Sequence, residues 1–215
     1  MCIRDRSQVH PAKAPKPRPY ADAPRLPEGD PIDPRALVGA EGPIELEIGP
    51  GRGGFVFERL AEDPAVRIFG LEIRLKWASI VDRRLAERGY GSRARVFAED
   101  ARYALPRFVA ASVARVFVHF PDPWWKKRHH KRLVVGAPLL DEVARVLVPR
   151  GEVFVQTDVE ERALGYEALL EAHPAFEPRG ESARVEAFPF SARSPREHRA
   201  LADGLPVFRL WYHRA

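Results

Sequence analysis

Cysteine is almost absent from this chain of 215 residues, which carries a single one at Cys2. One cysteine excludes an internal disulfide and any metal site built from several cysteine ligands. The chain also lacks an apolar run near the roughly 20 residues that a transmembrane helix needs, and its N-terminal stretch lacks the apolar core of a secretory signal. These absences predict a cytoplasmic protein without a membrane partner.

Lysine is scarce as well. The chain has six lysines, and three of them, Lys126, Lys127 and Lys131, lie in one short segment. Arginine is abundant throughout, and the formal net charge is +5. A basic protein favours a polyanionic partner. Because lysine is rare elsewhere, its clustering marks this segment as a candidate contact for such a partner.

The first 34 residues lack hydrophobic periodicity. They hold repeated prolines and many charges, a composition that forms neither a stable helix nor a central strand. We predict that residues 1–34 form a flexible arm and that residues 35–215 form one domain. The length of that domain suffices for a sizeable hydrophobic core.

Short apolar segments alternate with amphipathic ones from Ile44 onward. The expected strands are residues 44–49, 66–73, 93–100, 113–120, 151–158, 184–190 and 206–214, and the expected helices are residues 55–63, 75–89, 101–109, 134–151 and 160–173. This alternation predicts an α/β fold with a doubly wound, mostly parallel sheet, right-handed crossovers and helices on both faces. Because no long helix is expected between the last two strands, we predict an antiparallel hairpin at the edge of the sheet.

A glycine-rich loop follows the first strand. Gly49, Gly51 and Gly53 are spaced as G-x-G-x-G after Glu47, and Gly54 nearly completes the G-x-G-x-x-G pattern of dinucleotide-binding proteins. Glycines let the backbone turn tightly and approach a ligand closely. By itself the loop is compatible with S-adenosylmethionine, with a nicotinamide dinucleotide or with a plain tight turn.

Acidic residues at the strand ends help to choose between these ligands. Glu72 ends the second strand, where an acid accepts hydrogen bonds from ribose hydroxyls, and Asp100 ends the third, where an acid suits the adenine amino group. Acids also gather at solvated strand ends without any ligand. Glu47 beside the loop favours S-adenosylmethionine, which carries an ammonium and a sulfonium, over a dinucleotide, whose pyrophosphate a carboxylate repels.

The fourth strand ends in an unusual segment. The motif FPDPW at residues 120–124 precedes seven residues, 126–132, that carry five cations and two histidines. This segment, with LEIGPGRG, GLEI, EDA and TD in the expected order around it, resembles the bacterial tRNA (guanine-N7)-methyltransferases from Ile44 to the C-terminus. The resemblance implies a seven-stranded Rossmann-like methyltransferase sheet and S-adenosylmethionine as cofactor. It also implies methyl transfer to N7 of a tRNA guanosine, at position 46 of the variable loop.

The resemblance assigns roles to individual residues as well. It implies cofactor contacts at Glu47, Gly49, Gly51, Gly53, Glu72, Asp100 and Asp122, with Asp122 also as the catalytic acid. It implies guanosine contacts at Lys126, Asp158, Ser194 and Glu197. The last two belong to a Thr-x-x-Glu segment of the family. Here Pro195 and Arg196 replace the lysine and aromatic residue that are usual between them, a departure that bears on the substrate contacts rather than on the reaction.

The cationic segment is the expected RNA surface. Its candidate contacts are Trp124, Lys127, Arg128, His129, Lys131 and Arg132. A tryptophan can stack on an extruded base, and the cations can hold phosphates. Because adjacent histidines such as His129 and His130 do not converge readily on one ion, we predict no metal site. We further expect a monomer or a weak homodimer.

Three alternatives remain on sequence grounds. An amino-group methyltransferase of adenine or cytosine uses an Asp/Asn-Pro-Pro-aromatic turn at the same strand end, whereas Trp124 stands at the third position here. An NAD-linked oxidoreductase would leave the cationic segment without a role. A non-catalytic RNA-binding protein on a degenerate methyltransferase fold would have little reason to keep all four acids, Glu47, Glu72, Asp100 and Asp122.

Overall fold

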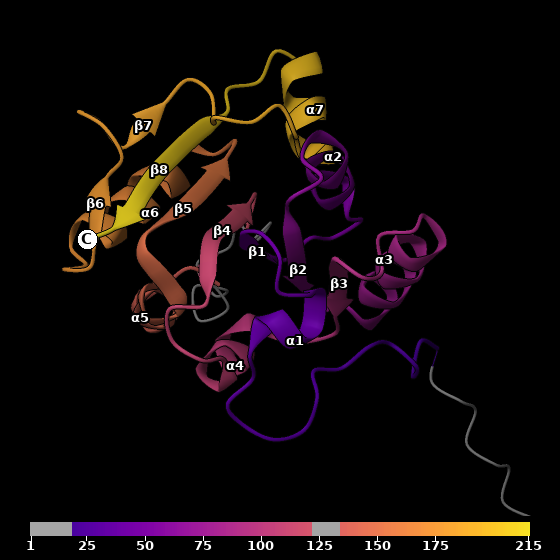
Figure 1. The fold of residues 1–215 in the computed structure, drawn as a ribbon. Helices are drawn as coiled ribbons and strands as arrows, with labels where there is room; N and C mark the ends of the chain where they lie inside the picture. Colours follow the sequence, from indigo (N-terminus) through magenta and orange to yellow (C-terminus); the bar gives the residue numbers. More distant parts are fainter. Residues whose placement is uncertain (1–18, 122–133) are drawn as a thin grey trace, which may run out of the picture.

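One sheet organises the computed structural model, which describes residues 19–121 and 134–215. Within these ranges its eight strands are β1 (Ile44–Ile48), β2 (Arg67–Leu71), β3 (Ala94–Phe97), β4 (Val113–His119), β5 (Leu147–Thr157), β6 (Phe176–Pro178), β7 (Arg184–Val185) and β8 (Phe208–Arg214). Their order is β3-β2-β1-β4-β5-β8-β6, and β7 also pairs with β8. The first five strands in this order are parallel, and β8 is antiparallel to β5, β6 and β7 (Figure 1).

The helices of the described ranges alternate with the strands along the chain. They are α1 (Pro34–Val38), α2 (Gly54–Glu62), α3 (Leu75–Glu87), α4 (Ala101–Ala104) with the 3-10 turn Leu105–Arg107, α5 (Ala137–Val146), α6 (Glu160–Glu171) and α7 (Pro195–Ala202). In these ranges, none is both long and apolar enough to cross a membrane.

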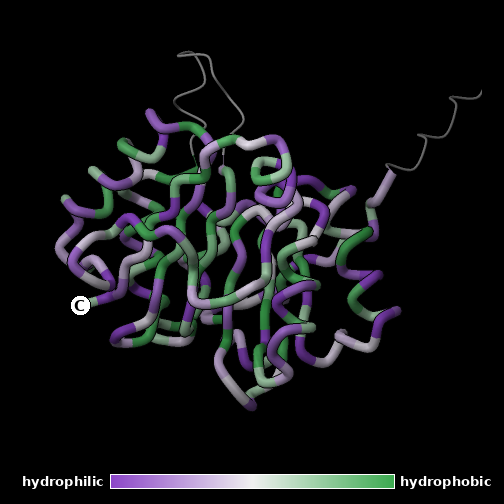
Figure 2. The backbone as a smooth tube through the Cα atoms, turned by 90° about the horizontal axis from the view of Figure 1, so that it is seen from above, coloured by the Kyte–Doolittle hydropathy of each residue, from purple (hydrophilic) through white to green (hydrophobic). Residues whose placement is uncertain are grey.

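Two apolar clusters form the core, one on each face of the sheet. Buried side chains of α1, α4, α5 and α6 belong to the first cluster, and those of α2 and α3 belong to the second. Neighbouring residues of β4 divide between them, since Val116 and Val118 pack in the first and Phe117 packs in the second. Apolar strands inside and hydrophilic turns outside are visible along the tube in Figure 2. The predicted doubly wound α/β fold is therefore confirmed.

The antiparallel C-terminal edge is also confirmed, but in a different form from the predicted hairpin. The expected strand over residues 184–190 is reduced to the two residues of β7, and α7 lies between it and β8. The short strand β6 provides a further antiparallel neighbour of β8, which the sequence did not indicate. Aromatic side chains explain the loss of the longer strand, because Phe188 and Phe190 turn inward and pack on Phe154.

The helix predicted over residues 134–151 is shorter than expected. α5 ends at Val146, and β5 starts at once with Leu147, whose φ of −65° and ψ of 140° are extended. Pro149 follows two residues later; a proline disfavours helical geometry in the residue before it, here Val148, so helices usually end at or before that residue. The strand that follows is longer than the predicted 151–158 for the same reason.

Part of the predicted N-terminal arm packs on the domain. Residues 19–34 of the predicted arm, 1–34, lie in the described ranges, and Ala23, Leu26 and Ile32 are buried in the core clusters. The backbone of Ile32 also exchanges hydrogen bonds with the segment around Phe108. Three apolar residues spaced among prolines therefore attach the irregular segment 19–34 to the domain, whereas residues 1–18 of the predicted arm lie outside the described ranges.

Candidate active site at the carboxyl edge of the sheet

The loop between β1 and α2 supplies the first wall of the site. Its backbone requires glycine at Gly51 and Gly53, whose φ angles are 56° and 76°. A Cβ atom at Gly53 would also stand 2.5 Å from Cγ1 of Val81 on α3. The loop closes through a hydrogen bond of 2.8 Å from the Gly53 N–H to the carbonyl of Pro50. The glycines, which include Gly49 at the end of β1, thus bring the start of α2 down onto α3.

Glu72, at the end of β2, lies directly beside this loop. Its buried carboxylate accepts a hydrogen bond of 2.8 Å from the N–H of Gly51. The other oxygen accepts hydrogen bonds from the backbone N–H and from Nε of Arg74, both at 2.9 Å. The structure therefore brings together two residues that the sequence assigned to one ligand, although they are 21 positions apart.

Glu47 is the most unusual acid of the site. Its side chain is 2% exposed, and its Oε1 contacts Nδ1 of His119 on the neighbouring strand β4 at 3.0 Å. Its Oε2 is buried and has no hydrogen-bond partner within the described ranges. An unpartnered buried carboxylate oxygen is costly, so it marks a place for a donor or a cation. The ammonium of S-adenosylmethionine fits this oxygen, whereas a pyrophosphate does not.

His119 is a site residue that the sequence reasoning missed. It is buried at the end of β4, where its ring packs edge-on against Phe55 with 4.3 Å between ring centroids. Its only signal in the sequence is a polar residue directly after the apolar run Val116–Val118. The histidine fixes one oxygen of Glu47 and leaves the second oxygen of that carboxylate for a ligand.

Asp100 lies at the third strand end, where it caps α4. One oxygen accepts the N–H of Arg102 at 3.0 Å, and the other accepts Nη2 of the same residue at 2.6 Å. These hydrogen bonds, together with the charge of the guanidinium, hold the pKa of the Asp100 carboxyl below its usual range. The group therefore stays ionised as an acceptor at neutral pH, and Arg102 competes with any ligand for it.

The second wall of the site comes from the C-terminal third of the chain. Ser194 caps α7, and its Oγ accepts the N–H of Glu197 at 3.2 Å. The Glu197 side chain is buried and accepts hydrogen bonds from Nη2 and Nε of Arg209 at 2.6 and 3.2 Å. Asp158, just after β5, pairs with Arg196 of α7. Three of the four predicted guanosine contacts thus lie on α7 or against it.

Helix α7 rests on α2, the helix that begins in the glycine loop (Figure 1). The ring of Pro195 lies so close to Gly54 that any Cβ there would overlap it. Glu58 of α2 accepts the N–H of Arg193 at 2.8 Å and contacts His198 at 2.7 Å. One turn later, Glu62 accepts the N–H of Ser191 at 2.6 Å. The predicted cofactor and substrate segments are therefore joined by direct contacts.

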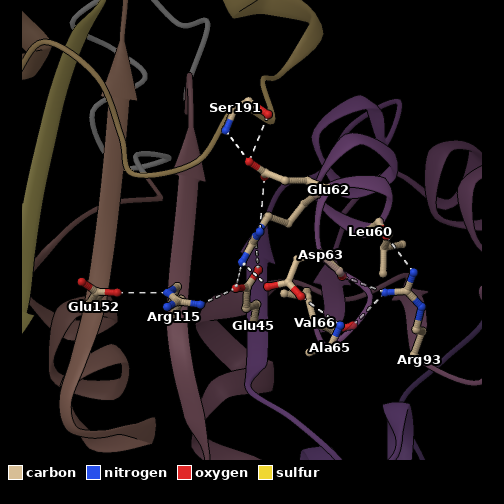
Figure 3. A network of polar contacts seen from close by, with 11 residues as sticks. Glu45, Leu60, Glu62, Asp63, Ala65, Val66, Arg93, Arg115, Glu152 and Ser191 are labelled. Atoms are coloured by element: carbon tan, nitrogen blue, oxygen red, sulfur yellow. Dashed lines mark hydrogen bonds and ion pairs between the residues drawn. The ribbon is translucent and has the colours of Figure 1, made fainter.

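A buried ion-pair network connects β1, α2 and β4, the elements on which both walls rest. Glu45 of β1 is fully buried and accepts hydrogen bonds from Arg59 of α2 at 2.9 and 3.0 Å and from Arg115 of β4 at 2.8 Å. Burial alone would lower the pKa of both arginines, but the hydrogen bonds and charge of Glu45 raise it. Figure 3 shows the contacts running from Glu152 through Arg115 and Glu45 to Glu62 and Ser191. No motif in the sequence indicated this network.

The remaining predicted residues lie outside the described ranges. These are Asp122, Trp124, Lys126, Lys127, Arg128, His129, Lys131 and Arg132. The described chain leaves β4 through Phe120, whose N–H donates to the carbonyl of Gln156 on β5 at 2.7 Å. The end of β4 itself lies at the carboxyl edge of the sheet, between the end of β1 and the end of β5.

Comparisons with known proteins agree with this geometry. Residues 41–210 match a family described as putative methyltransferase. A tRNA (guanine-N(7)-)-methyltransferase of Myxococcus xanthus is 38% identical over 180 residues, which cover 83% of this chain and 87% of the relative. A protein of the same name from Anaeromyxobacter dehalogenans is 40% identical over 178 residues, which cover 82% and 88%.

Among solved structures, the 16S rRNA methyltransferase KamB superposes with a TM-score of 0.62. The match covers 84% of this chain and 92% of that one at 15% identity, so it shows the shared fold alone. The sequence relatives are far more similar and span most of both chains. The chain therefore belongs to the tRNA (guanine-N7)-methyltransferase family of S-adenosylmethionine-dependent methyltransferases.

Proposed function

We propose that this protein transfers a methyl group from S-adenosylmethionine to N7 of guanosine 46 in the variable loop of tRNA. The observation that carries the reaction is the identity of 38 and 40%, over more than four fifths of the chain, to proteins named for it. With tRNA as the substrate, the enzyme acts in the cytoplasm, as the sequence leads us to expect. We also propose that the protein is a monomer or a weak homodimer and that it uses no metal.

The cofactor residues of the proposal are those of the first wall. Oε2 of Glu47 would accept the methionine ammonium, because it is buried and lacks a partner in the described ranges. The backbone of Gly49, Gly51 and Gly53 would lie along the ligand. Glu72 would accept from ribose hydroxyls and Asp100 from the adenine amino group. When bound, S-adenosylmethionine supplies an electrophilic methyl group.

The substrate side needs positioning more than proton transfer. Guanine N7 carries a free lone pair, so no general base is required before the transfer. Placing the two reactants in line can contribute about 7 to 11 kcal/mol. Asp158, Ser194 and Glu197 would orient the guanosine, with Lys126 on the same nucleotide. Asp122 would stabilise the positive charge that develops on the guanine ring.

The test of the proposed position uses two transcripts of one tRNA, one with guanosine at position 46 and one with adenosine there. We expect the protein to form 7-methylguanosine on the first transcript and none on the second. Equal methylation of both transcripts would place the target elsewhere in the tRNA. A methylated adenosine or cytidine would favour the amino-group methyltransferase instead.

A further inference from the structure

Arg196 stands where the resemblance to the family leads one to expect an aromatic residue, and no role for it follows from the sequence. In the structure its Nη2 donates to Oδ2 of Asp158, which joins α7 to the end of β5. The Asp158 side chain is 14% exposed and the Arg196 side chain is 44% exposed. The carboxylate is therefore largely buried, whereas the guanidinium that pairs with it is open to solvent.

The backbone on both sides of this pair is firmly held. Ser194 caps the first turn of α7, and Pro195 packs on Gly54 of the glycine loop. Asp158 follows Thr157, whose Oγ1 accepts the N–H of Val159 at 3.2 Å. Only the arginine side chain is free to leave without moving either element. Because the guanidinium side of this ion pair is open to solvent, a competing partner can displace it from the carboxylate.

Hydrogen-bonding capacity remains unused beside the pair. Gln156 lies two residues before Asp158 at the end of β5, and it is 1% exposed. Both polar atoms of its amide are buried and lack a partner among the described residues. Buried amides are normally paired, so this one indicates that the end of β5 is completed by something further. A nucleobase offers donors and acceptors of the required kind.

Arg196 and a guanine base would offer Asp158 similar hydrogen-bond donors. A guanidinium presents parallel N–H groups that match a carboxylate. The Watson–Crick edge of guanine presents N–H groups from N1 and the exocyclic amine in a similar fork. An RNA substrate also brings phosphates, for which arginine is a preferred ligand.

We propose that Arg196 pairs with Asp158 only while no tRNA is bound, and that guanine displaces it from this carboxylate when tRNA binds. In the empty enzyme it neutralises the carboxylate that the guanine will use, which reduces repulsion between that carboxylate and the incoming polyanion. When tRNA binds, the guanine edge takes over Asp158, and the guanidinium moves to a phosphate of the same RNA. This inference rests on the proposed role of Asp158 as a guanosine contact.

The experiment measures KM for tRNA and kcat at several salt concentrations, with S-adenosylmethionine saturating. For Arg196→Ala we expect KM to rise about five- to ten-fold with kcat nearly unchanged, because a charge-assisted phosphate contact is lost. The slope of log(1/KM) against log[salt] should become shallower by about 1. Arg196→Lys keeps the charge and should restore the slope.

Arg83→Ala is the matched control. Arg83 forms an exposed ion pair with Glu87 on α3, 3.6 Å apart, so its removal deletes the same kind of pair on another helix. We expect both KM and the salt slope of this variant to equal those of the wild type. Thermal unfolding of each variant shows whether α7 stays folded.

Two results would overturn the inference. If Arg196→Ala leaves KM and the salt slope unchanged, the pair is structural. If it lowers KM, Arg196 only competes with guanine and contacts no phosphate. Asp158→Ala separates this failure from that of the proposed function. Unchanged kinetics in Asp158→Ala would remove Asp158 from the guanosine site, whereas a raised KM there with normal Arg196→Ala kinetics would remove Arg196 alone.

Discussion

The first wall, called here the cofactor wall, is the β1–α2 loop with Glu47 and Glu72, and the second, the substrate wall, is α7 with Asp158. They differ in how far apart in sequence their contacting residues lie. In the cofactor wall, Glu47, Gly49, Gly51 and Gly53 follow one another, and Glu72 reaches the loop from 21 residues away. In the substrate wall, Glu58 holds Arg193 and His198 across 135 and 140 residues. The glycine conformations of one short segment shape the loop of the first wall, whereas contacts between α2 and the C-terminal third of the chain hold the second. Variants that affect one wall and spare the other therefore test this division.

The largest effect is expected where the two walls share support. Glu45→Gln leaves Arg59 and Arg115 without the charge of their common buried partner. We expect the free energy of unfolding to fall by about 3 kcal/mol, measured by urea denaturation. The control, Glu41→Gln, changes a glutamate whose side chain is 94% exposed, and it should be nearly neutral. Equal free energies of unfolding for the two variants would show that the Glu45 network does not stabilise the fold.

Asp122→Ala tests the chemical step apart from both walls. We expect turnover to fall by about 100- to 1,000-fold, because the charge developing on the guanine ring loses its stabilising carboxylate. Single-turnover kinetics with saturating tRNA and cofactor measure the step directly. The melting temperature of the variant should equal that of the wild type. Near-normal turnover would reduce Asp122 to a structural part of the turn.

Glu47→Gln addresses the cofactor wall alone. We expect the Kd for S-adenosylmethionine to rise about ten- to a hundred-fold, because the cation loses a charge-assisted hydrogen bond. Titration calorimetry measures this constant, and filter binding of tRNA should be unaffected. Glu87→Gln, on the exposed face of α3, is the matched control. If cofactor affinity survives in Glu47→Gln, the unpartnered oxygen of Glu47 serves some other group.

The smallest effect concerns pH and lies far from both walls. His213 of β8 is buried beside Arg150, and both burial and that positive charge lower its pKa below the ordinary 6.5. The unfolded chain therefore binds a proton at higher pH than the folded one, so stability falls as pH drops below about 6.5. His213→Gln should flatten this fall in the melting temperature. An identical pH profile in both proteins would assign the fall to other groups.

The doubly wound sheet and the tight glycine turn after β1 could be predicted from the sequence for a physical reason. Strand burial and glycine conformation act within a few residues, so a linear pattern records them. The packing of Ala23, Leu26 and Ile32 was not predicted, because isolated apolar residues in a proline-rich segment show no helical or strand periodicity. The shape of the C-terminal edge escaped it because Phe188 and Phe190 pack inward instead of extending a strand.

The substrate wall was predicted only through resemblance to the family. Ser194, Glu197 and Asp158 were named individually, but nothing in the sequence indicated that Arg209 and Arg196 pair with the two acids. Ion pairs between distant segments leave no periodic trace in a sequence, so they emerge only from the folded chain. His119 was missed for the same reason, since its partner Glu47 lies 72 positions away.

The measurement that tests the central claim most directly is nucleoside analysis of unmodified bulk tRNA after incubation with the purified protein and labelled S-adenosylmethionine. The account predicts that the label appears in 7-methylguanosine. Label in another nucleoside, or no transfer by a folded protein that binds the cofactor, would contradict it.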